Sequence, residues 1–184
     1  GICSSMLLKL ETGLVCSEMI SANGLVFGSA KTKALLASHS AEKPLSVQIF
    51  GADPDIMAEA GKIVEASGAD ILDVNFGCAV KKILKSGAGA ALMKSPETAK
   101  AVLTRLRAAV KVPLTIKLRS GWDPSGMEAL TLARVAQDCG VDAIAVHPRT
   151  ALQKFSGKAD WPLIARLKTS LNIPVIGNGD VETP

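Results

Sequence analysis

Cys78 stands where a buried apolar run gives way to a polar loop. The apolar run 69–74 is followed by Asn75-Phe76-Gly77-Cys78, and the basic, glycine-containing segment 81–87 comes next. A thiol at the end of a buried strand, facing a loop, is where a barrel enzyme places an acid or a nucleophile. Most lone cysteines are instead small hydrophobes that pack inertly. This run alone leaves both interpretations open.

The composition predicts one globular domain. The chain has 184 residues, 48% hydrophobic and 21% charged, which is enough for one well-buried core. It contains no run of 18 apolar residues and no visible secretory leader, so we expect a cytoplasmic protein without a membrane span. Four widely spaced cysteines and two distant histidines predict a reduced protein with no metal site. The net charge of +4 is compatible with phosphate or RNA as a partner, and equally with ordinary surface charge.

Strand and helix patterns alternate along the chain. Short apolar runs that end in glycine or polar residues predict six strands, which are Leu14–Met19, Leu45–Phe50, Ile71–Phe76, Leu114–Leu118, Ala143–His147 and Pro174–Ile176. Apolar residues at helical spacing, after capping residues such as Asp53-Pro54, predict four helices. These helices are Asp55–Gly68, Ser95–Val110, Ser125–Gly140 and Asp160–Leu171.

This alternation predicts right-handed parallel β/α units. The first and last predicted strands start at residues 14 and 174, so the five steps between them average 32 residues. Eight such units match the roughly 250 residues of a TIM (β/α)8 barrel. We therefore predict an incomplete barrel that holds units two to seven of the eight, as a single domain over residues 1–184, together with part of the helix before unit two. An open, doubly wound sheet is the alternative.

Polar side chains gather at the carboxyl ends of the predicted strands, where both architectures place their sites. Each one has a structural explanation; pairing with a buried carboxylate such as Asp73 or Glu18, for example, would explain Lys117. Together they supply amide, ammonium, guanidinium, imidazole and thiol groups, and burying these without partners costs several kcal/mol each. The set favours a polar, anionic, ring-shaped ligand, and its members are Gln48, Asn75, Cys78, Lys117, Arg119 and His147.

The last predicted strand is followed by Gly177-Asn178-Gly179-Asp180. Small residues let backbone N–H groups approach a phosphate, and the loop after strand seven is a favoured phosphate position in barrels. A glycine-rich loop alone is a weak signal. The dinucleotide fingerprint GxGxxG and the P-loop GxxxxGK[ST] are both absent.

At these residues the chain resembles the tRNA-dihydrouridine synthases, which are flavin enzymes built on an eight-fold barrel. The resemblance runs along essentially all 184 residues, and its strength lies in many short matches in the right order. The matching segments are Ser17-Glu18-Met19, Gln48-Ile49-Phe50-Gly51, Asn75-Phe76-Gly77-Cys78, Lys81-Lys82, Gly87-Ala88-Gly89-Ala90, Lys117-Leu118-Arg119-Ser120-Gly121-Trp122, Val146-His147-Pro148-Arg149-Thr150, Gly157-Lys158-Ala159-Asp160-Trp161 and Gly177-Asn178-Gly179-Asp180.

The resemblance implies FMN as cofactor, NADPH as reductant and tRNA as partner. It implies that hydride passes from N5 of reduced FMN to C6 of a uracil turned out of its stack, and that Cys78, as general acid, protonates C5. The other implied roles are flavin-ring contacts for Gln48 and Lys117, tail and phosphate contacts for His147, Asn178, Gly179 and Asp180, and positions near the uracil for Asn75 and Arg119. Lysines 81, 82 and 85 are candidate RNA phosphate contacts or a solvated basic face.

Two residues depart from the family pattern. Ala79 replaces the usual proline after the cysteine, which predicts a less rigid loop, and Pro148 replaces the usual glycine after His147, which restricts that histidine to extended geometry. The family's first strand is expected before Gly1. Its eighth strand and C-terminal helical RNA-binding domain are expected after Pro184. The chain therefore resembles a fragment of the barrel domain, and its own activity is left open.

Two alternative functions remain at this stage. One is a flavin barrel that acts on a free pyrimidine, resembling dihydroorotate dehydrogenase, and RNA dependence distinguishes the two enzymes. The other is a non-catalytic barrel fragment that serves as a binding module. Flavin binding separates that module from either enzyme.

Overall fold

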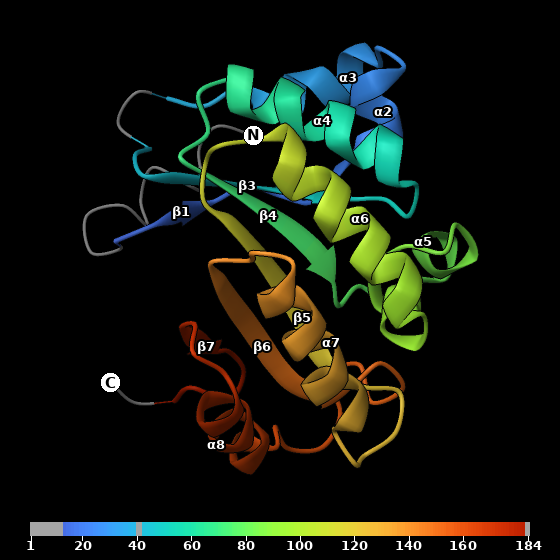
Figure 1. Cartoon of the computed structure of the whole chain (residues 1–184), viewed down its shortest axis with the longest axis vertical. Coiled ribbons are helices and arrows are strands. Elements are labelled where there is room, and N and C mark those ends of the chain that lie inside the picture. The colour runs from blue at the N-terminus through green and yellow to red at the C-terminus, as the bar shows by residue number, and fades with distance from the viewer. Residues whose placement is uncertain (1–12, 40–41, 183–184) are drawn as a thin grey trace.

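The computed structural model describes residues 13–39 and 42–182, which contain one parallel sheet (Figure 1). Its strands lie in the order β1-β3-β4-β5-β6-β7, and β2 pairs with β3 beyond the end of β1. The strands are β1 (Val15–Cys16), β2 (Ile20–Ser21), β3 (Leu45–Phe50), β4 (Ile71–Phe76), β5 (Leu114–Gly121), β6 (Ala143–Thr150) and β7 (Val175–Gly177). The helix expected before the first of these strands falls in residues 1–12, outside the described residues.

The strand order decides between the two predicted architectures. Each long strand pairs with the next one along the chain, and every pairing is parallel. A doubly wound sheet reverses its order at a switch point, whereas a barrel adds its strands consecutively round a circle. The incomplete barrel is therefore confirmed, and Figure 1 shows its strands fanning through an arc.

The helices follow the strands along the outside of this arc (Figure 1). Asp53 caps the first long helix by accepting hydrogen bonds from the N–H groups of Asp55 and Ile56, at 3.0 and 2.9 Å, as Asp53-Pro54 predicted. The long helices are α4 (Pro54–Ala66), α6 (Pro96–Ala109), α7 (Met127–Asp138) and α8 (Trp161–Ser170). Short helices that the sequence patterns missed are α2 (Ala22–Val26), α3 (Ala30–Lys33), η1 (Ala34–Leu36), α5 (Lys81–Lys85) and η2 (Gly89–Lys94).

The predicted strand 14–19 is interrupted in the structure. Residues 17–19 separate β1 from β2, and the hydroxyl of Ser17 accepts a hydrogen bond of 3.0 Å from the backbone N–H of Gln48 in β3. A side chain thus occupies a position that a backbone carbonyl takes in a regular ladder. The bounds of β3 and β4, in contrast, were predicted to the residue.

The strands present different chemistry on their two faces. In β4, Leu72, Val74 and Phe76 are fully buried in the apolar core between sheet and helices, whereas Asp73 and Asn75 alternate with them and face the inside of the arc. The sequence predicted strands that are apolar on both faces. The inner face instead carries the polar side chains, which brings them to one side of the sheet.

Two aspartates repeat the same contact at the amino ends of the strands. The carboxylate of Asp70, just before β4, accepts a hydrogen bond of 2.7 Å from the N–H of Leu45, which begins β3. Asp142, just before β6, accepts one of 2.7 Å from Leu114, which begins β5. These contacts fix the register of each strand pair. The register in turn sets where the carboxyl ends of the strands lie relative to one another. No helix in the described part of the chain is long and apolar enough to cross a membrane.

Candidate functional site

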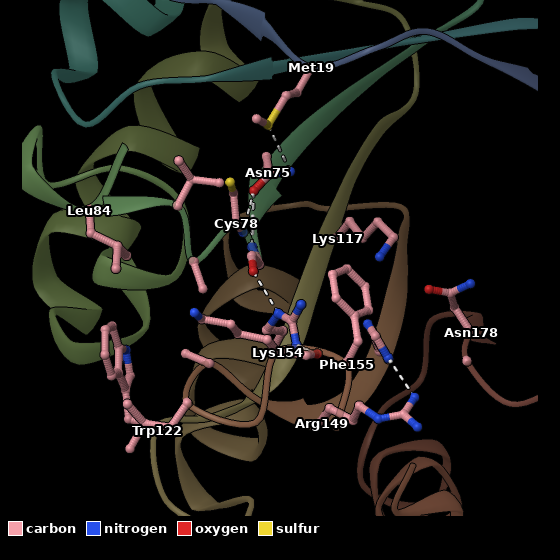
Figure 2. Close-up of a pocket in the computed structure, with 18 of the residues that line it drawn as sticks. Met19, Asn75, Cys78, Leu84, Lys117, Trp122, Arg149, Lys154, Phe155 and Asn178 are labelled. Atoms are coloured by element: carbon pink, nitrogen blue, oxygen red, sulfur yellow. Dashed lines mark hydrogen bonds between the residues drawn. The ribbon is translucent and has the colours of Figure 1, made fainter. Parts of the chain in front are cut away.

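One large cavity lies at the carboxyl ends of β4 to β7 (Figure 2). Its volume is about 1130 Å³, at the upper end of the range for small-molecule and cofactor sites. Four segments contribute most of its lining: the Cys78 loop (residues 77–80), the strand ends of β5 and β6, the β6–α8 loop (residues 151–160) and residues 178–180. In the view of Figure 2, Cys78 lies with Leu84 and Trp122 on one side, and Lys117 lies with Asn178 on the other.

The Cys78 loop is held through its backbone. Asn75 Oδ1 accepts hydrogen bonds from the N–H groups of Gly77 and Cys78, at 3.1 and 2.8 Å. The carbonyl of Cys78 accepts from Ala90 at 3.0 Å, and that of Gly77 accepts from Arg119 Nε at 2.8 Å. All four backbone polar groups of the two residues therefore have protein partners. These contacts order the loop even though Ala79 stands where the family has proline.

Gly89→Ala is expected to displace this loop. Gly89 has a φ of +62°, and a Cβ there would lie 2.6 Å from the Cys78 carbonyl oxygen and 3.2 Å from its Cβ. The variant should lose about 1–3 kcal/mol of stability and change the alkylation rate of Cys78. Gly87→Ala is the matched control, because Gly87 also has positive φ (+75°) but its Cβ would meet only Ala52 at 3.5 Å. Equal alkylation rates in the two variants would contradict the expectation.

Lys117 reaches the cavity from the middle of β5 without a partner for its ammonium group. Within residues 13–39 and 42–182, it forms no ion pair or hydrogen bond, including with Asp73, so the pairing considered from the sequence does not occur. Burial, followed by the nearby charge of Arg119, lowers the pKa of Lys117, and Asp73 opposes this only in part. A partly buried, unpaired cation at a cavity wall is suited to an anionic ligand.

His147 and Arg149 lie two residues apart on β6, and a strand places such residues on the same face. The Arg149 guanidinium donates to His147 Nε2 at 3.2 Å. Because a guanidinium cannot accept, Nε2 is the acceptor, and the neutral ring carries its proton on Nδ1. Burial, then the charges of Arg119, Lys117 and Arg149, lower the pKa of His147 to about 4, so the imidazole is neutral at pH 7.

This shift predicts a pH-dependent stability. The unfolded chain binds a proton at His147 below about pH 6.5, whereas the folded chain does so only below about pH 4. The unfolding free energy should therefore fall as the pH drops from 6.5 toward 4, by at most about 2 kcal/mol from this group at pH 5. Denaturant titrations at pH 7 and pH 5 should show a smaller loss for His147→Gln than for the unmodified chain. Identical losses would contradict the shifted pKa.

Arg149 connects the two loops that follow β6 and β7. It forms a two-pronged ion pair with Asp180, at 2.8 and 2.9 Å, and donates to the carbonyl of Gly157 at 2.7 Å. The Asp180 carboxylate also accepts from the N–H of Ala159 at 2.8 Å, and this bond, followed by Arg149, lowers its pKa. The side chain of Asp180 thus holds residues 178–180 against Arg149 and the β6–α8 loop. Gly179 packs so closely that a Cβ would lie 2.7 Å from the His147 ring.

Gln48, Asp73 and Asn75 form a hydrogen-bonded group on the inner face of the sheet. Gln48 donates to Asp73 at 2.6 Å and accepts from Asn75 Nδ2 at 2.8 Å, while Thr115 donates to Asp73 at 2.5 Å. Burial raises the pKa of Asp73, with the bonds from Thr115 and Gln48 opposing it. Asn75 also holds the Cys78 loop, so this group orients the side chain that positions the backbone of Cys78.

Eight of the nine residues predicted as site residues line the cavity. They are Asn75, Cys78, Lys117, Arg119, His147, Asn178, Gly179 and Asp180. Gln48 does not line it and reaches it only through Asn75. Every buried side-chain nitrogen or oxygen of the described residues has a hydrogen-bond partner. Many of the polar groups that suggested a ligand therefore also have a structural explanation. The individual roles therefore remain predictions.

Sequence reasoning missed two features of the cavity. Arg149 was not assigned to the site, although its spacing from His147 could have indicated it. The exposed apolar side chains of Val80, Leu152 and Phe155 at the cavity also left no periodic signal, because they lie in loops. Among the described residues, no group of three histidine, cysteine or acidic side chains could hold a metal ion.

Fold and cavity together define an incomplete β/α barrel with a cation-rich site at the carboxyl ends of its strands. Two solved structures share this fold at low sequence identity. Histamine dehydrogenase from Rhizobium sp. 4-9 matches 97% of the chain and 38% of its own, with a TM-score of 0.70 and 12% identity. A phosphonopyruvate hydrolase complex with oxalate and magnesium matches 96% and 63%, with a TM-score of 0.67 and 13% identity.

The family model "Dihydrouridine synthase (Dus)" matches residues 2–184, and the chain belongs to this family. The chain is 40% identical over 181 residues to tRNA-dihydrouridine synthase B of Shewanella oneidensis, covering 98% of this chain and 56% of that protein. It is 41% identical over 176 residues to the protein of the same name from Xanthomonas axonopodis pv. citri, covering 96% and 53%. The chain thus spans about half the length of these curated relatives.

Proposed function

We propose that this chain is the barrel portion of an oxidoreductase that reduces uridine in tRNA to 5,6-dihydrouridine. The observation that carries the proposal is the meeting of Cys78, Lys117, Arg119 and His147 around one cavity in a chain of this family. Cys78 comes from the loop after β4, Lys117 and Arg119 from β5, and His147 from β6. Relatives named tRNA-dihydrouridine synthase B support the choice of reaction and of tRNA as partner. A tRNA substrate also agrees with the cytoplasmic location predicted from the sequence.

The cavity fits FMN, which we propose as the cofactor, with NADPH as its reductant. Its volume of about 1130 Å³ admits a ring system with a phosphorylated tail, and Lys117 supplies an unpaired cation. The tail and phosphate would contact His147, Asn178 and Gly179. Asp180 would hold the loop through its ion pair with Arg149, because its own negative charge would repel a phosphate. When bound and reduced, the flavin supplies the hydride that C6 of uracil accepts.

Cys78 is the proposed proton donor to C5 of the uracil. Its sulfur belongs to a loop whose backbone is fixed at all four polar groups of residues 77 and 78, so the thiol is held in one place at the cavity. A positioned general acid contributes about 10²–10⁴-fold to a rate. Lys117 places positive charge where negative charge accumulates during reduction, which is the electrostatic contribution of a fixed cation.

RNA contacts are proposed for the basic residues beside the cavity. Lys81 and Lys154 line it, and Lys82 and Lys85 belong to α5, directly after the Cys78 loop. Lysines at such a surface bind phosphates and release the counterions condensed on the RNA. This release favours binding less as the salt concentration rises, so binding should weaken with salt. The uracil leaves its stack to enter the cavity.

The proposal is tested with the purified chain, FMN, NADPH and unmodified tRNA. We expect the visible absorbance of bound flavin, its bleaching by NADPH, and uridine that gains two hydrogens, detected by mass spectrometry of nuclease-digested tRNA. Turnover of free uracil or orotate without tRNA would instead indicate a free-pyrimidine enzyme. A chain that binds no FMN and modifies no tRNA would contradict the proposal and favour a binding module.

A further inference from the structure

We propose that Arg119 is a positioning residue that links the Cys78 loop to the β6–α8 loop, so that the placement of the thiol depends on the loop across the cavity. The link itself stands on the hydrogen bonds of Arg119. Its consequence for catalysis rests on the function proposed above. The sequence resemblance assigned Arg119 only a place near the uracil.

The Arg119 guanidinium donates to carbonyl groups on both sides of the cavity. Its Nε bonds the Gly77 carbonyl at 2.8 Å, and its Nη1 bonds the carbonyls of Lys154 at 2.7 Å and Thr150 at 3.2 Å. Arg119 is only 8% exposed, so water does not readily replace these partners. A planar guanidinium holds its donors in a fixed geometry, so moving either loop misaligns the bonds to the other.

On the cysteine side, Arg119 is the one hydrogen-bond partner of Gly77 and Cys78 that comes from a neighbouring strand, among residues 13–39 and 42–182. Asn75, which holds both N–H groups, belongs to the same strand end, and Ala90 holds the carbonyl of Cys78 from η2. Within the part of the chain that the structure describes, only the hydrogen bond from Arg119 to Gly77 connects this loop to a side chain of β5, and through it to the β6–α8 loop. With alanine rather than proline at position 79, the chain after Cys78 has no ring to restrict φ.

On the opposite side, Arg119 meets the segment that carries the exposed apolar groups. Leu152 and Phe155 are 72% and 80% exposed, and the guanidinium lies 5.6 Å from the centre of the Phe155 ring. Lys154, between them, has a φ of +54°, which is unfavourable for a lysine and needs support from its surroundings. The 2.7 Å bond to its carbonyl supplies such support, so this conformation and the Cys78 loop share one side chain.

Arg119 is therefore placed to relate the two loops. A substrate that pressed on the β6–α8 loop would move the carbonyl of Lys154, and with it that of Thr150 at the end of β6, and the guanidinium would carry that change to Gly77, next to the thiol. Among the described residues, none accepts a hydrogen bond from Nη2 of Arg119. That group remains available to a ligand without disturbing the link.

Hydrogen–deuterium exchange of the chain carrying Arg119→Lys tests the link. A lysine offers a single ammonium in place of the fork, so it cannot hold the carbonyls of both loops at once, and neither loop keeps the geometry that the guanidinium imposed. We expect exchange to accelerate about tenfold in both the 76–80 and 150–157 peptides, because local opening becomes easier. Arg119→Gln should do the same if the lysine variant fails to fold. Acceleration in only one peptide, or in neither, would overturn the link.

Arg107→Lys is the matched control. Arg107 also donates to two backbone carbonyls, those of Val110 and Val112, at 2.7 and 2.9 Å, and pairs with Asp142. It belongs to α6, however, and its contacts lie before the amino end of β5. Its replacement should accelerate exchange around residues 110–112 and leave the 76–80 and 150–157 peptides unchanged. Acceleration of these two peptides in the control would mean that they report general loosening, and the proposal would fall.

Kinetics of the flavin-loaded enzyme distinguish a positioning role from a cofactor-binding role. Arg119→Lys should lower kcat for tRNA about 10²-fold, because a misplaced acid reacts slowly, while flavin reduction by NADPH keeps its rate. Equal losses in both half-reactions would show that Arg119 acts on the flavin and overturn the positioning role. If the unmodified enzyme formed no dihydrouridine, the proposed function would fail, whereas the exchange comparison would still decide the link.

Discussion

Cys78→Ala should reduce dihydrouridine formation by about 10²–10⁴-fold while leaving flavin reduction by NADPH unchanged. The thiol lies at the cavity on a loop whose backbone contacts do not involve its sulfur, so removing the sulfur leaves Asn75, Ala90 and Arg119 in their bonds to that loop. Only the second half-reaction needs a proton at C5 of the uracil. Stopped-flow measurement of flavin bleaching, followed by mass spectrometry of the tRNA, separates the two steps.

Cys139→Ala is the control for this prediction. Its thiol is also half-buried, but it lies between α6 and α7 against Thr104 and the carbonyl of Lys100, on the outside of the arc. Both half-reactions should remain intact in the control. Normal dihydrouridine formation by Cys78→Ala would remove Cys78 as the acid, and loss of flavin reduction would point to a structural role.

Lys117→Met should slow flavin reduction by about 10²–10³-fold and weaken FMN binding, yet leave the flavin-free chain at least as stable as before. The ammonium has no partner among the described residues, and burial and Arg119 both disfavour its charge. Methionine keeps the length of the side chain and removes that unfavourable burial. Thermal unfolding without flavin and titration with FMN measure the two opposite effects.

Lys62→Met is the corresponding control, because Lys62 is exposed on α4 and pairs with Glu59. It should change neither FMN binding nor flavin reduction. If Lys117→Met destabilised the flavin-free chain without changing FMN binding or flavin reduction, Lys117 would be a structural residue. The combination of weaker binding and undiminished stability is what a residue retained for its ligand should show.

Local signals in the sequence were sufficient for most of the barrel. The Asp53-Pro54 cap and the apolar runs of β3 and β4 gave element positions that the structure confirms, because capping and burial act over a few neighbouring residues. The interruption at Ser17 was not predictable in the same way. It depends on a hydroxyl that meets the backbone of Gln48, which lies 31 residues further along the chain.

The candidate site shows the same division. Residues at the strand ends were found from their types and positions, and eight of nine line the cavity. Gln48 was placed at the cofactor by the family resemblance, and that role stays a prediction; in the structure its side chain bonds Asp73 and Asn75. A pattern gives the strand on which an amide lies, whereas its partner depends on the side chains of the neighbouring strands.

The sequence by itself determined the repeating β/α units, the family and the thiol at the end of the fourth strand, since periodicity, capping and short motifs are properties of adjacent residues. Only the tertiary structure decided that the strands follow a barrel order, that Arg149 pairs with Asp180, and that Arg119 joins two loops across the cavity. These contacts link residues about 30 to 40 positions apart, whose meeting depends on the shared curvature and register of the whole sheet.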